Sequence, residues 1–248
     1  MRLKNSFIDS PQLFDAIYRF KNYRHECDKL RTLVDATLPG ARTLLDVACG
    51  TGEHAKFLKR HYAVDGLDIN ERYLDAAREK NPAGNYSRGD MMDFDLGRSY
   101  DVVTCLFSAI GVVKTFERLE RAIVCMACHV KPGGLLIVEP WFTPQKWRPA
   151  QPFVLVGEIG ADRVYRISNS IRQGQTSILL HHYLRSTRAG IELCRERIEL
   201  GLFTRDEMAW AFASGGMVAR YDSEGLMGRG LYVGRFYAGP RPRLAGPR

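Results

Sequence analysis

The sequence predicts an α/β protein, with a mostly parallel sheet, helices on both faces, and an antiparallel β insertion after the fifth strand. Three observations lead to this prediction. Short apolar runs alternate with segments of helical spacing between residues 43 and 141. Consecutive strand-like segments with turn residues between them follow over residues 153–202. A glycine turn, CGTG at residues 49–52, joins the first apolar run to a helical segment. Alternation is typical of a parallel sheet, whereas consecutive short strands are typical of antiparallel pairing.

The N-terminal region is predicted to form two helices, around residues 11–20 and 23–37. Ser10 suits the N-cap of the first helix, and Pro11 suits its first turn. Apolar residues then recur at helical spacing through both segments. We therefore expect a helical cap over residues 1–40.

The middle of the chain alternates expected strands and helices. The expected strands cover residues 43–48, 63–69, a short segment ending near Gly89, 101–107 and 134–141. The expected helices cover residues 53–61, 71–80 (capped by Asn70) and 116–130. Together with the C-terminal part of the chain, this region is expected to form one domain, residues 41–147 and 203–238.

The expected insertion, residues 148–202, contains four strand-like segments. They cover residues 153–159, 163–173, 176–185 and 191 to about 203. Thr204 and Glu207 then fit a capping box for a helix over residues 206–216. A last strand is expected over residues 230–238, and the tail, residues 239–248, is expected to be disordered.

Composition narrows the classes of partner. A formal net charge of +8 fits an acidic partner, which means nucleic acid, a membrane or a phosphorylated small molecule. No basic stripe is interleaved with aromatic residues, so nucleic acid is a minority option. The sequence has no apolar run of ~18 residues and no secretory signal at its start, so a membrane helix and export are not expected.

The cysteines indicate the compartment. Six cysteines follow no disulfide framework spacing, which favours a reducing cytoplasm. Cys125 and Cys128 form a CxxC pair, but a second pair at metal-binding spacing is missing. Buried helix packing is therefore favoured over zinc for this pair, and no metal site is expected.

The glycine turn after the first strand carries the strongest chemical signal. Gly50 and Gly52 let a ligand approach the backbone there. Asp68 closes the second strand, and Asp90 follows the third. Because carboxyl ends of parallel strands meet at one edge, Asp68 can accept both hydroxyls of a ribose while Asp90 accepts an adenine amino hydrogen.

Two neighbouring residues narrow the ligand further. Met91 can stack on an adenine ring. Glu53 stands near the start of the helix, where a carboxylate would repel the pyrophosphate of a dinucleotide. A nucleoside with a cationic sulfonium, S-adenosylmethionine, meets no such conflict.

The pieces LDVACGTG, GLDIN, GDMMDF and VKPGG occur in this order, and together they resemble the Rossmann-like S-adenosylmethionine-dependent methyltransferases. The resemblance implies a mostly parallel seven-stranded sheet and S-adenosylmethionine as the cofactor. It also implies a set of cofactor-binding residues: Tyr23, Ala48, Gly50, Gly52, Asp68, Ile69, Asp90, Met91 and Leu106.

Five further motifs, CLFSAIG, EPWF, SNSIRQG, LFTRDE and GRGLYVG, are similar to those of the sugar N-methyltransferases of antibiotic biosynthesis. Those enzymes dimethylate the amine of a TDP-linked aminodeoxysugar. The resemblance implies that the β insertion helps to form the substrate cleft and a homodimer. It implies substrate-binding roles for Phe7, Phe14, Ser108, Val112, Trp141 and Arg229. Arg229 would lie near the phosphates, whose oxygens suit the guanidinium fork.

The sequence departs from that family at two positions. Val112 stands where the family tends to have His or Tyr near the acceptor amine, and the family's N-terminal tyrosine is also missing, with Phe7 beside its expected place. Valine accepts neither a proton nor a hydrogen bond. The general base is therefore unknown from sequence, with Tyr18, Glu139, His181 and His182 as candidates.

These departures keep other functions open. The same cofactor could serve a hydroxyl, a carbon or a non-sugar amine as acceptor. An RNA-directed methyltransferase would need salt-sensitive binding to nucleic acid. A non-catalytic protein would bind the cofactor without methylating any acceptor.

Overall fold

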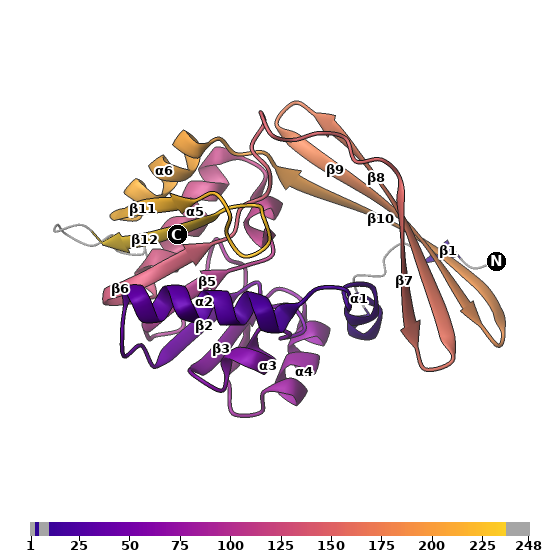
Figure 1. Ribbon diagram of the computed structural model, residues 1–248, viewed down its shortest axis with the longest axis horizontal. Coiled ribbons are helices and arrows are strands. Elements are labelled where there is room, and N and C mark those ends of the chain that lie inside the picture. Colours follow the sequence, from indigo (N-terminus) through magenta and orange to yellow (C-terminus); the bar gives the residue numbers. More distant parts are fainter. Residues whose placement is uncertain (1–2, 5–9, 237–248) are drawn as a thin grey trace.

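The computed structural model describes residues 3–4 and 10–236, and it forms two sheets with helices around the larger one (Figure 1). Phe7 and the tail 239–248 therefore lie outside the described residues. The larger sheet has seven strands in the order β11-β12-β6-β5-β2-β3-β4. Its strands are β2 (Thr43–Val47), β3 (Ala63–Asp68), β4 (Tyr86–Arg88), β5 (Tyr100–Cys105), β6 (Val130–Val138), β11 (Met217–Asp222) and β12 (Leu231–Phe236). The predicted fold class is confirmed.

The order in which strands are added to the larger sheet reverses at the central strand, β2. From β2 the chain moves outward through β3 and β4, and it then returns to the other side of β2 with β5 and β6. All of these neighbours pair in parallel, whereas β12 pairs antiparallel with both β6 and β11. Ligands of open α/β sheets bind beyond the carboxyl ends of the strands at such a reversal. The fold therefore places the candidate site above β2 and β5.

Apolar residues of the parallel strands alternate between two cores. Leu45, Val103 and Leu136 pack in one core beneath α5 (Phe116–Cys128) and α6 (Arg205–Ser214). Leu44 and Val102 face the opposite side and pack with residues of α2 (Tyr23–Thr37) and α3 (Ala55–Leu58). Both faces of the sheet are thus covered, which explains why its strands read as continuous apolar runs.

Local signals in the sequence fix the helix starts. Side-chain oxygens of Ser10, Asn70 and Thr204 accept backbone N–H groups at the starts of α1 (Pro11–Ile17), α4 (Glu71–Lys80) and α6. Thr204 and Glu207 form both hydrogen bonds of the capping box. These predicted caps are confirmed. Each such cap typically stabilises its helix by about 1 kcal/mol.

The smaller sheet has five strands in the order β1-β10-β9-β8-β7. Its strands are β1 (Leu3–Lys4), β7 (Phe153–Ile159), β8 (Asp162–Gln173), β9 (Thr176–Thr187) and β10 (Gly190–Gly201). The chain enters it after β6 and leaves it before α6, as an insertion after the fifth strand should. The strands β7 to β10 pair antiparallel, and β1 adds to β10 in parallel.

The two N-terminal helices pack on different sheets. Leu13 and Ile17 of α1 cluster with Val164 and Tyr183 of the smaller sheet, whereas α2 packs on the larger one. At Gly157 a side chain would meet the backbone of α1 at 2.8 Å, so glycine allows β7 to lie directly against this helix. The α1 helix therefore connects the two sheets, as Figure 1 shows.

Several boundaries differ from the predictions. The first helix ends at Ile17 rather than near residue 20, because Tyr18 caps it and Asn22 starts the next helix. The helix expected over residues 53–61 is only α3, and a 3-10 helix, η1 (Ala109–Val113), was not expected. The edge strand β11 was missed because all of its residues except Met217 are exposed or only partly buried, and its apolar pattern is weak.

The CxxC pair lies in α5, where Cys125 is buried and its thiol donates to the carbonyl oxygen of Phe94. Across residues 3–4 and 10–236, no group of three or more His, Cys, Asp or Glu side chains could hold a metal ion. In the same part of the chain, no helix is both long enough and apolar enough to span a membrane.

Candidate active site

The glycine turn after β2 bends the backbone through left-handed conformations. Ala48, Gly50 and Gly52 have φ angles of 58°, 55° and 76°. A side chain on Gly50 would enter open space, whereas one on Gly52 would come within 2.9 Å of the Cβ atom of Ala77 in α4. Gly50 therefore keeps the ligand side of the turn open, and Gly52 lets the turn pack against α4.

Asp68 fastens this turn to the end of β3. Its two carboxylate oxygens accept the backbone N–H groups of Gly50, at 2.8 Å, and Asn70, at 2.9 Å. Burial raises the pKa of Asp68, although these hydrogen bonds act in the opposite direction. Each carboxylate oxygen can accept more than one donor, so Asp68 can still accept hydroxyl groups.

The first cavity lies beside Asp68 and has a volume of about 360 Å³. It is lined by Ala48, Leu67, Asp68, Ile69, Gly89, Asp90, Met91, Met92, Ala109, Val112 and Val113. Five of the predicted cofactor residues are thus brought together. One oxygen of Asp90 accepts the backbone N–H of Met92 at 2.9 Å, which holds this carboxylate at the end of β4. Two carboxylates and apolar walls around one cavity suit the polar edges and flat faces of a nucleoside.

The second cavity adjoins the first at Ala48 and is smaller, about 50 Å³. It is lined by Phe14, Tyr23, Asp46, Ala48, Cys49, Gly50, Thr51, Glu53, His54, Leu106 and Phe107. The predicted cofactor residues Tyr23, Gly50 and Leu106 lie here. So does Phe14, which was predicted to contact the substrate.

Asp46 is the buried acid of the second cavity. One of its oxygens accepts the hydroxyl of Thr104 at 2.8 Å, while the other has no partner among the described residues. Burial raises the pKa of this carboxyl group. A buried carboxylate oxygen without a partner is costly, and a cationic ligand group would offset that cost.

Glu53 belongs to an ion-pair network beside the glycine turn. Its carboxylate lies 2.7 Å from the ammonium of Lys80, which also pairs with Asp15 of α1 at 2.6 Å. Asp15 in turn accepts the hydroxyl of Thr51. This network ties α1 and α4 to the glycine turn, and the one ammonium is shared by two carboxylates.

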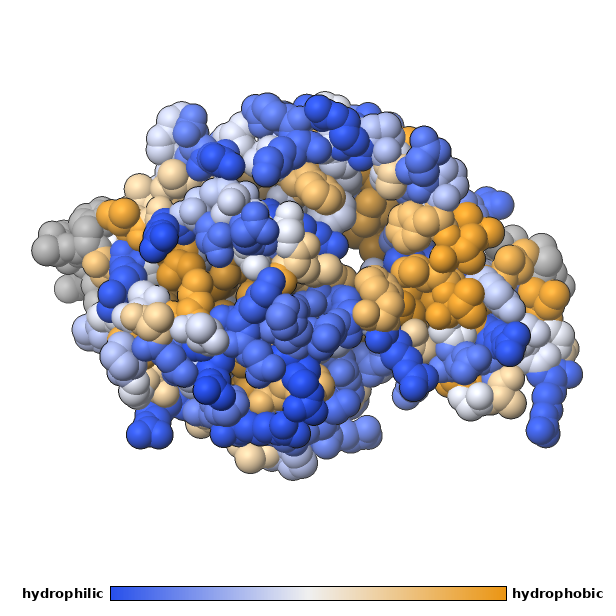
Figure 2. All heavy atoms as spheres, viewed as in Figure 1, coloured by the Kyte–Doolittle hydropathy of each residue, from blue (hydrophilic) through white to orange (hydrophobic). Residues whose placement is uncertain are grey.

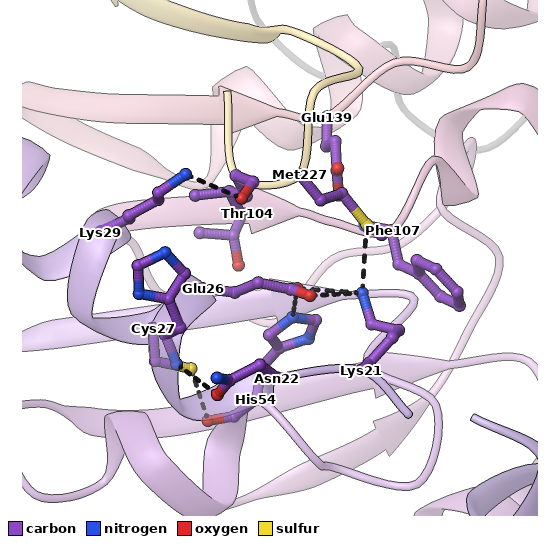
Figure 3. A network of polar contacts seen from close by, with 12 residues as sticks. Lys21, Asn22, Glu26, Cys27, Lys29, His54, Thr104, Phe107, Glu139 and Met227 are labelled. Carbon is purple, nitrogen blue, oxygen red and sulfur yellow. Dashed lines mark hydrogen bonds and ion pairs between the residues drawn. The ribbon is translucent and has the colours of Figure 1, made fainter. Parts of the chain in front are cut away.

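A buried ionic cluster beneath this region was missed by sequence reasoning (Figure 3). Glu26 accepts the ammonium of Lys21 at 2.8 Å and lies 3.0 Å from Nε2 of His54. The Lys21 ammonium also lies 3.8 Å from the ring centroid of Phe107 and 3.4 Å from the sulfur of Met227. Four segments far apart in the sequence meet here, so the spacing of residues along the chain could not predict the cluster.

The turn after β5 is strained and is held by polar contacts. Phe107 and Ser108 both have left-handed φ angles, 53° and 60°. Glu139 accepts the N–H of Phe107 at 2.6 Å, and the hydroxyl of Ser108 donates to the carbonyl of Pro140 at 2.7 Å. One oxygen of the candidate base Glu139 is thus committed to this turn. Burial raises its pKa, against the nearby charge of Arg229.

Arg229 reaches the same turn from the loop before β12. It donates to the hydroxyl of Ser108 at 3.2 Å, and its guanidinium lies 4.9 Å from the ring centroid of Trp141. Lys29 holds the Arg229 loop by donating to the carbonyl of Leu226 at 3.2 Å. Three predicted substrate residues, Ser108, Trp141 and Arg229, are therefore in contact.

The third cavity, about 210 Å³, lies between α1 and the smaller sheet. It is lined by Leu13, Phe14, Ile17, Tyr18, Tyr73, Val112, Tyr183, Glu196 and Ile198. Phe14 also lines the second cavity and Val112 the first, so all three cavities adjoin. The candidate base Tyr18 lines the third cavity. Glu196, Tyr73 and Tyr183 were not predicted.

The two histidine candidates lie elsewhere on the smaller sheet. His181 is buried, has no hydrogen-bond partner in the described part of the chain, and does not line the third cavity. Burial lowers its pKa to about 3, so it is uncharged at neutral pH. His182 is the next residue along β9 and is exposed, on the opposite face.

Known proteins resemble this chain over nearly its whole length. A family model described as "Methyltransferase domain" matches residues 44–134. A dTDP-3-amino-3,6-dideoxy-alpha-D-glucopyranose N,N-dimethyltransferase of Streptomyces fradiae is 37% identical over 90% of this chain and 89% of its own. The crystal structure of Streptomyces venezuelae DesVI, 33% identical, superposes with a TM-score of 0.86 over 94% of this chain and 100% of that one. The chain belongs to the sugar N-methyltransferase family.

The cofactor of this sugar N-methyltransferase is S-adenosylmethionine. The structure of CalS10, an amino pentose methyltransferase from Micromonospora echinaspora, was solved with that cofactor bound. CalS10 is 34% identical to this chain and superposes with a TM-score of 0.82, over 90% of this chain and 96% of its own. The first two cavities fit such a group, because two carboxylates line each of them and one oxygen of Asp46 has no partner among the residues that the structure describes.

Proposed function

We propose that this enzyme methylates the amine of a TDP-linked aminodeoxysugar. The observation that carries the proposal is the third cavity, which adjoins both other cavities and is lined in part by an acid, Glu196. The relative from Streptomyces fradiae is named for the same reaction. S-adenosylmethionine supplies an activated methyl group, and the protein must hold a nucleophile in line with it at ~3–3.5 Å.

In this proposal the first two cavities hold the cofactor. Asp68 accepts the ribose hydroxyls, and Asp90 accepts the adenine amino group while Met91 packs on the ring. Ala48, Gly50, Ile69, Leu106 and Tyr23 line the surrounding walls, whereas Gly52 lines neither cavity and acts through the packing of the turn on α4. The free oxygen of Asp46 accepts a donor from the amino-acid part of the cofactor.

Arg229 recognises the nucleotide part of the acceptor. Its guanidinium is held beside Trp141 and Ser108, and a fork of N–H donors suits two phosphate oxygens. We expect Arg229→Ala to raise the KM for the nucleotide sugar by about 10–100-fold, because a charge-assisted contact is lost. Steady-state kinetics measure this effect. Affinity for S-adenosylhomocysteine should be unchanged, and an unaltered KM would exclude phosphate binding by Arg229.

A second acceptor class remains a candidate because much of the third cavity is apolar. Leu13, Ile17, Val112 and Ile198 line it, and none of these side chains hydrogen-bonds to a sugar. A non-sugar amine or a hydroxyl compound of similar size would also fit between these apolar side chains.

The acceptor class is tested with matched compounds. The purified enzyme is incubated with the methyl donor and with nucleotide sugars that carry either an amino or a hydroxyl group at the same carbon. We expect a mass gain of one or two methyl groups for the amino compounds alone. Methylation of the hydroxyl compound, or of neither, would refute the proposal. Binding of RNA at moderate salt would favour a nucleic-acid substrate instead.

We also propose that the enzyme is a cytoplasmic homodimer joined through the β insertion. Val154, Val156, Ile167 and Ile191 of the smaller sheet are between 41% and 59% exposed, and Figure 2 shows apolar side chains gathered over β7. Exposed apolar side chains on one sheet favour association. All six cysteines are free thiols, which fits a reducing compartment. Light scattering after size-exclusion chromatography tests the dimer, and a monomer would refute it.

A further inference from the structure

Among the described residues that line the third cavity, Glu196 of β10 is the one acid. Its Oε2 atom accepts the hydroxyl of Tyr183 at 2.7 Å, while Oε1 has no hydrogen-bond partner in the described part of the chain. The residue is only 8% exposed. Since buried polar atoms in folded proteins are almost always paired, an unpaired carboxylate oxygen that lines a cavity calls for a ligand donor.

The groups around Glu196 do not neutralise it by direct contact. Tyr73 and Tyr18 line the same cavity, and no ion pair joins Glu196 to a described Lys, Arg or His. Arg166 of β8 is buried close enough to act on Glu196 electrostatically, but its guanidinium lies over the ring of Tyr18, 4.8 Å from the centroid. His181 is directly opposite Glu196 in the strand register and is uncharged at neutral pH.

We propose that Glu196 binds the ammonium form of the acceptor amine and takes its proton. This step rests on the proposed function. An N–H bond of the ammonium breaks and an O–H bond forms at Oε1, so that the lone pair remains on nitrogen for attack on the methyl group. Glu196 then releases the proton to water. A second methylation of the same nitrogen uses the same step, because the monomethylated product again carries a proton.

Glu196 can act as the general base, a role that Val112 cannot fill. Val112 lines the boundary between the first and third cavities, and Glu196 lines the same third cavity. Glu139 does not line any of the three cavities and holds the turn at Phe107, and neither histidine lines the third cavity. Burial raises the pKa of Glu196, which brings this base nearer to the pH at which proton transfer is efficient.

The test compares Glu196→Gln with the wild type across pH. We expect kcat/KM at neutral pH to fall by about 10²–10⁴-fold, the usual contribution of a general base. The deficit should shrink strongly above the amine's own pKa, because the acceptor then arrives without its extra proton. Glu196→Asp should restore part of the rate at neutral pH.

Binding of the acceptor gives a second readout without turnover. In calorimetry with S-adenosylhomocysteine present, the wild type should bind the amino sugar nucleotide more tightly than the hydroxyl compound. Glu196→Gln should lose most of that preference and keep its affinity for the hydroxyl compound. A deficit that does not change with pH, or an equal loss of affinity for both compounds, would overturn the role of Glu196.

Two controls separate the possible failures. Glu199→Gln alters an acid on the same strand that pairs with Lys114 and Arg197 and lies outside the three cavities, so its kinetics should match the wild type. Glu196→Gln should unfold at the same temperature as the wild type or higher, because it removes a buried charge without a salt-bridge partner. If the wild type methylates no amino sugar nucleotide, the proposed function fails, whereas normal turnover by Glu196→Gln overturns this inference alone.

Discussion

Carboxylates at the two ends of the parallel sheet have different surroundings. At the amino ends of the strands, Asp101 accepts the N–H groups of Arg42 and Thr43, at 2.9 and 2.8 Å, and pairs with Lys131 at 3.0 Å. At the carboxyl ends, Asp46 and Glu139 are fully buried and each has one oxygen without a partner in the described residues.

The pKa values follow the same division. Partial burial raises the pKa of Asp101, but the hydrogen bonds and Lys131 outweigh it and lower the value to about 2. Burial dominates for Asp46, Asp68 and Glu139, and it raises all three pKa values. Asp101 therefore stabilises the fold. Burial of Asp46, Asp68 and Glu139 at the carboxyl ends costs stability, which fits the proposed ligand site at this edge.

The largest effect of a single substitution is expected at Asp68. Asp68→Ala removes the acceptor for Gly50 and Asn70 as well as the proposed contacts to ribose. We expect the affinity for S-adenosylhomocysteine to fall by at least about 100-fold, since several hydrogen bonds to a charged group are lost together. Calorimetry measures this affinity. Asp75→Asn, at an exposed acid of α4, should bind S-adenosylhomocysteine with the affinity of the wild type. Unchanged affinity in Asp68→Ala would contradict a ligand-binding role for this acid.

A smaller effect is expected at Asp46. Asp46→Asn keeps an oxygen that can accept from Thr104 but removes the buried charge. We expect about 10-fold weaker binding of S-adenosylhomocysteine, with thermal stability at neutral pH equal to or above that of the wild type. The sign follows from the raised pKa: the cost of burying the charge is fully present above that pKa and falls as the pH drops from there to the unfolded value, about pH 4. A clear loss of stability would contradict a functional role for the free oxygen.

The smallest effect is expected at Asp101. Here the substitution should change stability and not cofactor affinity. Asp101→Asn should lower the free energy of unfolding by about 1–2 kcal/mol while cofactor affinity stays unchanged. The lowered pKa means that this stabilisation is present above the unfolded value, about pH 4, and is lost as the pH falls towards about 2. Denaturant unfolding across this range should show a shallower loss for the variant than for the wild type. A loss of cofactor affinity without a loss of stability would contradict a purely structural role for Asp101.

Local signals explain what could be predicted from the sequence. The apolar runs, the glycine turn and the acids after β3 and β4 are short-range patterns. They correctly indicated the sheet, and the two acids that they singled out, Asp68 and Asp90, line the first cavity. The caps at Ser10, Asn70 and Thr204 were equally local. Each depends on residues within a few positions of one another, so one sequence is enough to recognise them.

Long-range packing explains what was missed. Glu196 lies on one face of β10 among residues that alternate in and out of the core, and its place in the third cavity depends on how α1 packs on the insertion. The cluster of Lys21, Glu26 and His54 joins α2 to the glycine turn in the same way. The spacing of residues along the chain does not predict contacts between such distant segments. Strand register across β8, β9 and β10 decides them, because a shift by one residue would turn Glu196 to the other face.

A crystal structure of the enzyme with S-adenosylhomocysteine and an amino sugar nucleotide would test most directly whether the cofactor and the acceptor bind in the three adjoining cavities. We predict ribose hydroxyls on Asp68, the sugar nitrogen within hydrogen-bond distance of Glu196, and a phosphate against Arg229. A nucleoside bound away from Asp68, or a sugar nitrogen outside the third cavity, would contradict the account.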